Sequence, residues 1–119
     1  MTLDEYDQFC GSLPQTEKAV QWGGAHVWKV GGKLFAVAGW NDGEDLAVTF
    51  KVSDIAYHVL RDEPGLRPAP YLASRGMTWI QHYAEPGLPD EGLKDHIEAS
   101  YRMAIQRLTK KKRLELGLT

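Results

Sequence analysis

Residues 26–39, HVWKVGGKLFAVAG, predict a β-hairpin around which the rest of the chain is arranged. On either side of Gly31-Gly32 lie runs of β-branched and aromatic residues, which strands favour. A Gly-Gly pair suits a two-residue turn of type I′, because both central positions need a positive φ and glycine adopts it at little steric cost. We therefore expect two antiparallel strands joined at residues 31–32.

Further strands are predicted on both sides of this hairpin. Residues 18–22, KAVQW, indicate a short strand that ends at Gly23-Gly24. Residues 46–52 alternate between large apolar side chains and smaller or polar ones, and a period of two is typical of a half-buried strand. Consecutive antiparallel strands are thus expected over about 26–52, with one face of the sheet open to solvent. A last strand is predicted over 77–83.

Two long helices are predicted at the two ends of the chain. The first covers about 2–12, where Thr2 and Glu5 have the spacing of a capping box. The other covers about 90–108, with Asp90 as its cap and a continuous apolar stripe along one side. Both helices are expected to pack on the same face of the sheet.

A shorter helix is predicted between the strands, over about 54–61, capped by Ser53 or Asp54. Its apolar side is assigned to Ile55, Val59 and Leu60. The proline-rich segment that follows is expected to be an extended loop that packs through Leu66, Tyr71 and Leu72.

Length and composition predict one globular domain over residues 1–109, followed by a basic C-terminal tail over 110–119. The formal net charge is −2, which disfavours strong nonspecific affinity for nucleic acid. The single cysteine, Cys10, lies among apolar residues and is read as a core residue rather than a reactive thiol. The chain has no long apolar run and no signal peptide pattern, so we expect a cytoplasmic protein that binds no membrane, with a monomer favoured.

No group of residues predicts catalysis or a metal site. The histidines lie far apart in the sequence and lack metal-ligand spacing, and only one cysteine could assist them. Neither a phosphate-binding loop nor a nucleophile elbow is present. We therefore expect a non-catalytic protein with no cofactor and no metal. The histidines are His26, His58, His82 and His96.

Basic residues are the more informative set, since they could neutralise phosphates without reading a nucleotide sequence. The alternative is a solvated face, together with a favourable charge at the C-terminus of a helix. The candidate DNA-binding residues are Lys29, Lys33, Lys51, Arg67, Arg75, Lys110, Lys111 and Lys112.

Aromatic residues allow a second hypothesis. Trp28 and Trp79 could be base-stacking platforms, although filling the space between sheet and helices is the favoured interpretation. A small-ligand-binding or protein-binding module could instead use an exposed aromatic face around Trp28, Trp40 and Trp79. A concave pocket lined by those rings, with few cations nearby, would favour this hypothesis.

Several short motifs, in their order and spacing, resemble the MmcQ/YjbR family nearly from end to end of the chain. The motifs are Trp22-Gly23, the segment 30–35, Lys51, Pro70-Tyr71, Trp79 and Ser100-Tyr101. The resemblance implies a two-layer α+β domain similar to the CyaY/frataxin fold, with an antiparallel sheet packed by the N- and C-terminal helices. It also implies DNA binding through a double wing of β-hairpins. Frataxins use an acidic ridge on the first helix, and Asp4, Glu5 and Asp7 make iron handling a distant alternative.

Overall fold

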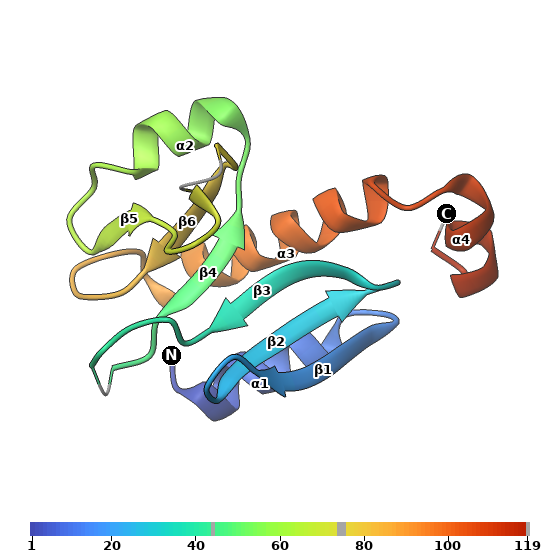
Figure 1. Ribbon diagram of the computed structural model, residues 1–119, viewed down its shortest axis with the longest axis horizontal. Coiled ribbons are helices and arrows are strands. Elements are labelled where there is room, and N and C mark those ends of the chain that lie inside the picture. The colour runs from blue at the N-terminus through green and yellow to red at the C-terminus, as the bar shows by residue number, and fades with distance from the viewer. Residues whose placement is uncertain (44, 74–75, 119) are drawn as a thin grey trace.

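The computed structural model describes residues 1–43, 45–73 and 76–118 as a sheet with helices on one face (Figure 1). The strand order is β1-β2-β3-β4-β6-β5, and every neighbouring pair is antiparallel. The predicted α+β class is confirmed. The elements are α1 (Leu3–Ser12), β1 (Thr16–Gln21), β2 (Ala25–Val30), β3 (Lys33–Ala38), β4 (Val48–Lys51), α2 (Asp54–Leu60), β5 (Leu66–Pro68), β6 (Trp79–His82), α3 (Asp90–Gln106) and α4 (Lys110–Leu116).

The predicted hairpin is β2–β3, and its turn has the expected backbone. Gly31 and Gly32 have φ values of +56° and +83°. The pairing shifts between Trp28 and Lys29, so that Phe35 is an extra residue in β3. A bulge of this kind increases the local twist of the strands. The hairpin is therefore more strongly twisted near its turn.

The core lies between the sheet and two helices, α1 and α3, which share one face of the sheet (Figure 1). Trp28 and Trp79 are both buried, with 8% and 3% of their surface exposed. Trp28 lies in this core as predicted, whereas Trp79 is paired with Lys51 on the opposite face of the sheet. Cys10 is also fully buried, as predicted, and burial raises the pKa of its thiol well above the usual range.

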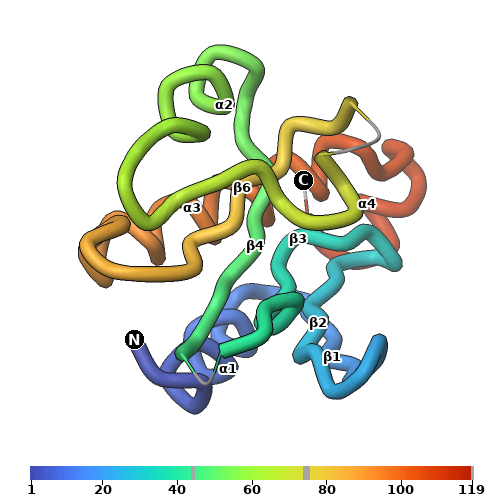
Figure 2. The backbone as a smooth tube through the Cα atoms, turned by 60° about the vertical axis from the view of Figure 1, so that its left-hand side comes forward, coloured from blue at the N-terminus to red at the C-terminus, as the bar shows by residue number. Residues whose placement is uncertain are grey.

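The middle of the opposite face is buried, so the half-buried interpretation of residues 46–52 is wrong. Val37, Thr49 and Gln81 form one cross-strand row on that face, and all are fully buried. The segment after β5 crosses over them (Figure 2), and its Tyr71 ring lies 5.3 Å from the ring of Trp40. The periodicity of a strand cannot predict that this face is buried, because the loops that cover it come from distant parts of the chain.

Several local predictions need correction. Ile55 and Val59 of α2 are 80% and 60% exposed, and other residues of α2, among them Leu60, pack against the core. Asp90 is the first residue of α3 rather than its cap, which is Pro89. The proline-rich loop contains β5, which was not predicted. None of the described helices combines the length and hydropathy that crossing a bilayer requires.

Ser100 of α3 occupies the place where the β3–β4 ladder ends. The ladder stops at the pair Ala36 and Phe50. Beyond it, the hydroxyl of Ser100 donates to the carbonyl of Phe35 at 2.7 Å and accepts from the Lys51 amide at 2.9 Å. The hydroxyl thus replaces a direct hydrogen bond between the two strands. Because Ser100 is fully buried, it joins α3 to both strands at this point.

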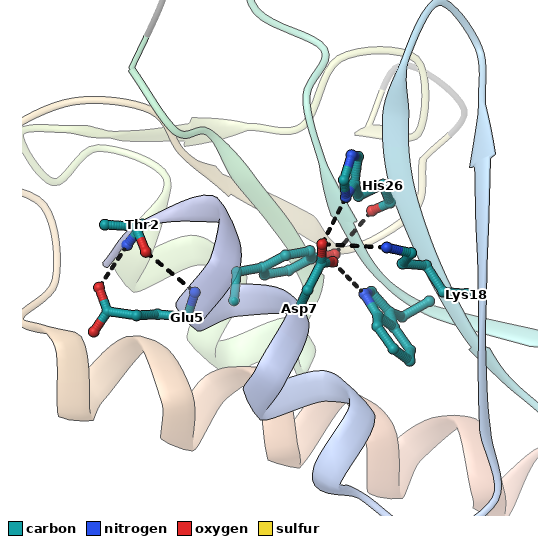
Figure 3. A network of polar contacts seen from close by, with 7 residues as sticks. Thr2, Glu5, Asp7, Lys18 and His26 are labelled. Carbon is teal, nitrogen blue, oxygen red and sulfur yellow. Dashed lines mark hydrogen bonds and ion pairs between the residues drawn. The ribbon is translucent and has the colours of Figure 1, made fainter.

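Asp7 links α1 to the first two strands (Figure 3). Its carboxylate accepts hydrogen bonds from Trp28 Nε1 at 2.9 Å and from His26 Nδ1 at 2.8 Å. Lys18 Nζ lies 3.4 Å from the same carboxylate. Burial alone would raise the pKa of Asp7, but these hydrogen bonds and the charges of His26 and Lys18 hold it below the usual value. Asp7 is therefore a structural link.

Replacing Asp7 by alanine is expected to lower the free energy of unfolding by about 2 kcal/mol, because it leaves the buried Trp28 Nε1–H without a partner. Chemical denaturation measures the change. The matched control is Asp4→Ala, one turn earlier on an exposed position of the same helix, where a change of about 0.5 kcal/mol is expected. Equal effects of the two substitutions would contradict the structural role of Asp7.

The stability that Asp7 supplies should also depend on pH. A carboxyl whose pKa is lower in the folded protein stabilises the fold above its unfolded pKa of about 3.9, and the contribution disappears as the pH falls through the folded value. Wild type and Asp7→Ala should therefore differ most near neutral pH and converge in acid. Denaturation curves at several pH values test this, and a constant difference down to low pH would contradict it.

Candidate nucleic-acid interface

Two basic segments lie together at one end of the molecule, the turn of the β2–β3 hairpin and the α3–α4 junction (Figure 1). The last residue of β4, Lys51, is near enough to Arg107 for the two charges to interact, and we call the whole set the basic end. Five of the predicted residues belong to this set, and Arg107 was not predicted. The residues of the basic end are Lys33, Lys51, Arg107, Lys110, Lys111 and Lys112.

Packing and one hydrogen bond hold these elements together. A Cβ on Gly31 would lie 2.9 Å from the side chain of Leu108 and 3.2 Å from that of Leu116, so the hairpin turn rests directly on the α3–α4 junction. Arg107 Nη2 donates to the carbonyl of Leu34 at 2.9 Å. The segment predicted as a basic tail thus contains α4, which packs beside the hairpin.

The residues of the basic end take no part in the ion pairs that join described residues. Burial, with a further contribution from the like charge of Arg107, lowers the pKa of Lys51, and the nearby charge of Asp54 opposes that shift. Lys51 lies over the ring of Trp79, with its ammonium 5.7 Å from the centroid.

The lysines of α4 do not stabilise that helix through its dipole. Lys110, Lys111 and Lys112 occupy the first turn, where the helix dipole disfavours positive charge. The predicted favourable charge at the C-terminus of a helix concerns the helix before them, α3, whose C-cap is Arg107. Their exposed ammonium groups are available to an anionic partner.

The remaining predicted residues lie apart from the basic end. Lys29 is opposite Leu34 on the face away from α1 and α3. Arg67 is on β5, at the far edge of the sheet, where its Nε donates to Gln81 Oε1 at 2.8 Å and its guanidinium lies 4.4 Å from the ring centroid of Tyr83. Arg75 lies outside the described residues.

A second feature, which we call the aromatic cleft, lies on the face away from α1 and α3. It is a cavity of about 440 Å³. Trp40 stands at its centre, 5.4 Å from the ring of Trp22 and 5.3 Å from that of Tyr71. The same three rings also border a more polar hollow that includes Arg67. The cleft is lined by Trp22, Leu34, Trp40, Tyr71 and Leu72.

The three aromatic residues of the cleft all have left-handed backbones. Their φ values are +50° for Trp22, +61° for Trp40 and +69° for Tyr71. Such a conformation is an outlier for a bulky residue and costs about 1 kcal/mol or more at each position. Strain of this kind occurs preferentially where a protein binds ligands.

The predicted aromatic face is wrong in its members, since Trp28 and Trp79 are buried and only Trp40 takes part. Trp22 was missed as a site residue. The glycines next to Trp22 and Trp40 in the sequence are a signal that could have identified these two residues as members of the site. Trp22 precedes Gly23-Gly24, and Trp40 follows Gly39, so both tryptophans lie at turns rather than inside strands.

The Asp7–His26 pair has the residue types of an acid–base pair. The other partners of the Asp7 carboxylate, Trp28 and Lys18, lie on β2 and β1 and join those strands to α1. The Asp7–His26 pair is therefore part of the structural link between α1 and the sheet. Within the described residues, no group of three or more histidine, cysteine, aspartate or glutamate side chains is placed to hold a metal ion.

Comparison with known proteins places this arrangement in a family. A family model described as YjbR matches residues 11–103. The uncharacterised protein YjbR of Escherichia coli strain K12 is 30% identical over 116 residues, which cover 95% of each chain. Deinococcus radiodurans protein DR2400 has a TM-score of 0.84 at 23% identity, covering 99% of this chain and 89% of that one. A Pseudomonas syringae protein has a TM-score of 0.69 at 18% identity, covering 87% and 99%.

The two solved structures show a shared fold, a six-stranded antiparallel sheet with helices packed on it, of the kind found in DUF419 and YjbR proteins. The match to the family model extends from the end of α1 almost to the end of α3. The chain belongs to the YjbR family, and the predicted resemblance to MmcQ/YjbR proteins is confirmed.

Proposed function

We propose that this protein binds nucleic acid by contacting its phosphate backbone through the basic end. The observation that carries the proposal is the meeting of unpaired cations from β3, β4 and the α3–α4 junction, in a chain whose net charge is −2. Like charges brought together repel one another, and an anionic partner removes that repulsion. Phosphates carry the matching charge at regular spacing.

The shape of the basic end suits a nucleic-acid backbone. The turn at Gly31-Gly32 projects as a narrow hairpin tip, and α4 lies beside it (Figure 1). Lys33 is exposed at the tip, and the lysines of α4 are exposed on its first turn. Contacts of this kind position a protein on nucleic acid and carry no sequence information. We therefore expect binding that is salt-sensitive and largely independent of sequence.

Replacing Lys110, Lys111 and Lys112 together by glutamine is expected to weaken binding and to reduce its salt dependence. Each lost phosphate contact reduces the magnitude of the slope of log affinity against log salt by about 1. The slope of the triple variant should therefore be smaller in magnitude than that of wild type by about 2 to 3. Fluorescence anisotropy with a labelled duplex, at several salt concentrations, measures both quantities.

The matched control removes the same charge from outside the basic end. Lys18, Arg61 and Lys94 lie on β1, at the end of α2 and near the start of α3. Their joint replacement by glutamine should leave the salt slope close to that of wild type. If both variants lose affinity equally, net charge rather than the basic end explains the binding, and the proposal fails.

A further inference from the structure

The aromatic cleft adjoins the basic end through a single residue, Leu34. Its side chain lines the cleft, and its carbonyl accepts the hydrogen bond from Arg107 of the basic end. Leu34 follows Lys33 directly in β3. The start of β3 thus belongs to the basic end through Lys33 and to the cleft through Leu34.

Positive charges stand on both sides of the cleft. Lys29 is the cross-strand partner of Leu34, and residues paired in this way share one face of a sheet. On the opposite side, Arg67 borders the polar hollow that shares the three aromatic rings. Hydrogen bonding to Gln81 and contact with Tyr83 hold the Arg67 guanidinium in place. A cation thus lies on each side of the cleft, and on the Arg67 side the Asp42 carboxylate borders the same hollow.

The rings of the cleft offer stacking surfaces to solvent. Trp22 is 55% exposed and Tyr71 is 66% exposed, while Trp40 supports both from the centre. Exposed aromatic faces beside a positively charged path are the features by which proteins hold single-stranded nucleic acid, because every base has a face that can stack. A base within a duplex is already stacked and is not available to such a cleft.

We infer that the aromatic cleft takes an unstacked base of a single-stranded nucleic acid whose phosphates lie on the basic end. This inference rests on the proposed function and names its substrate class. The base stacks on Trp22, and the adjoining hollow supplies the Arg67 guanidinium as a donor and the Asp42 carboxylate as an acceptor for polar groups of the base. Single strands are therefore bound more tightly than duplex of the same phosphate number.

The test compares ligands that differ only in their bases. Labelled oligothymidylate of about ten nucleotides and an abasic oligomer of equal length carry the same phosphates, so the difference between their affinities isolates stacking. Wild type should bind the oligothymidylate about 5-fold to 100-fold more tightly. Equal binding of the two oligomers would overturn the inference, as would competition by free thymidine monophosphate at the concentration of the oligomer.

Trp22→Asn removes the stacking ring and keeps a residue that tolerates a left-handed backbone. It should abolish the preference for bases and leave binding of the abasic oligomer unchanged. The control, Val20→Asn, alters a residue of β1 that is 59% exposed, similar to Trp22, and should retain the preference.

The outcomes separate the two proposals. If duplex and abasic oligomers bind in a salt-sensitive way but bases add nothing, or if Trp22→Asn retains the preference, the inference about the cleft fails and the proposed function stands. If no oligomer binds even at low salt, the proposed function fails and the inference fails with it.

Discussion

Gly65→Ala is expected to lower the free energy of unfolding by about 3 kcal/mol or more. Gly65 has a φ of +88°, and an added Cβ would lie 2.2 Å from the carbonyl oxygen of Ala84 and 2.6 Å from the amide nitrogen of Gly87. These are backbone atoms, so side-chain rotation cannot relieve the contact. The turn must open, and β5 with Arg67 then shifts relative to β6. Chemical denaturation monitored by tryptophan fluorescence measures the loss.

Gly32→Ala is the matched control, because Gly32 has nearly the same φ, +83°, and open space where its Cβ would lie. It should cost only the strain of the left-handed backbone, about 1 kcal/mol. The difference in the free energy of unfolding between the two variants therefore measures how closely Gly65 packs against the backbone of Ala84 and Gly87. If both lose the same stability, the packing of Gly65 against Ala84 and Gly87 is not as described.

The second large effect is expected for Ser100→Ala, with a loss of about 2 to 4 kcal/mol in the free energy of unfolding. The substitution removes the hydroxyl that connects the Phe35 carbonyl to the Lys51 amide. Both backbone groups then lose their partner where the strands are already separated by the inserted side chain. Alanine is only slightly smaller than serine, so most of the loss in the free energy of unfolding comes from the two hydrogen bonds.

Ser12→Ala provides the comparison for Ser100, since the Ser12 hydroxyl also donates to a backbone carbonyl, that of Phe9, but does so at an exposed position. Water replaces that hydrogen bond, and a change within about 0.5 kcal/mol is expected. A loss at Ser100 as small as that at Ser12 would mean that water enters between β3 and β4.

Much of the fold follows from local sequence patterns. The Gly31-Gly32 turn and the Thr2–Glu5 capping box are formed within a few residues, and both have the predicted geometry. The cover over Val37 and Thr49 has no local pattern, because it is produced by a segment that returns from β5 at the far edge of the sheet. Strand periodicity therefore identified β4 but assigned it an open face that it does not have.

The candidate site likewise has parts that the sequence predicts and parts that depend on the fold. Lysines can be found in a sequence, but their meeting at the basic end depends on α4 packing against the hairpin turn at Gly31. Arg107 was missed because nothing in the sequence shows that it reaches the carbonyl of Leu34. Trp22 and Tyr71 lie 49 positions apart in the chain. Their approach to Trp40 depends on two loops that no short pattern relates.

The most direct test of the central proposal is the salt dependence of wild-type binding to nucleic acid. Log affinity plotted against log salt should fall with a slope of about −3 to −5, as expected if most of the basic end contacts phosphates. That result would establish backbone contact as the source of affinity. A flat plot, or no detectable binding at low salt, would contradict the proposal that the basic end holds nucleic acid.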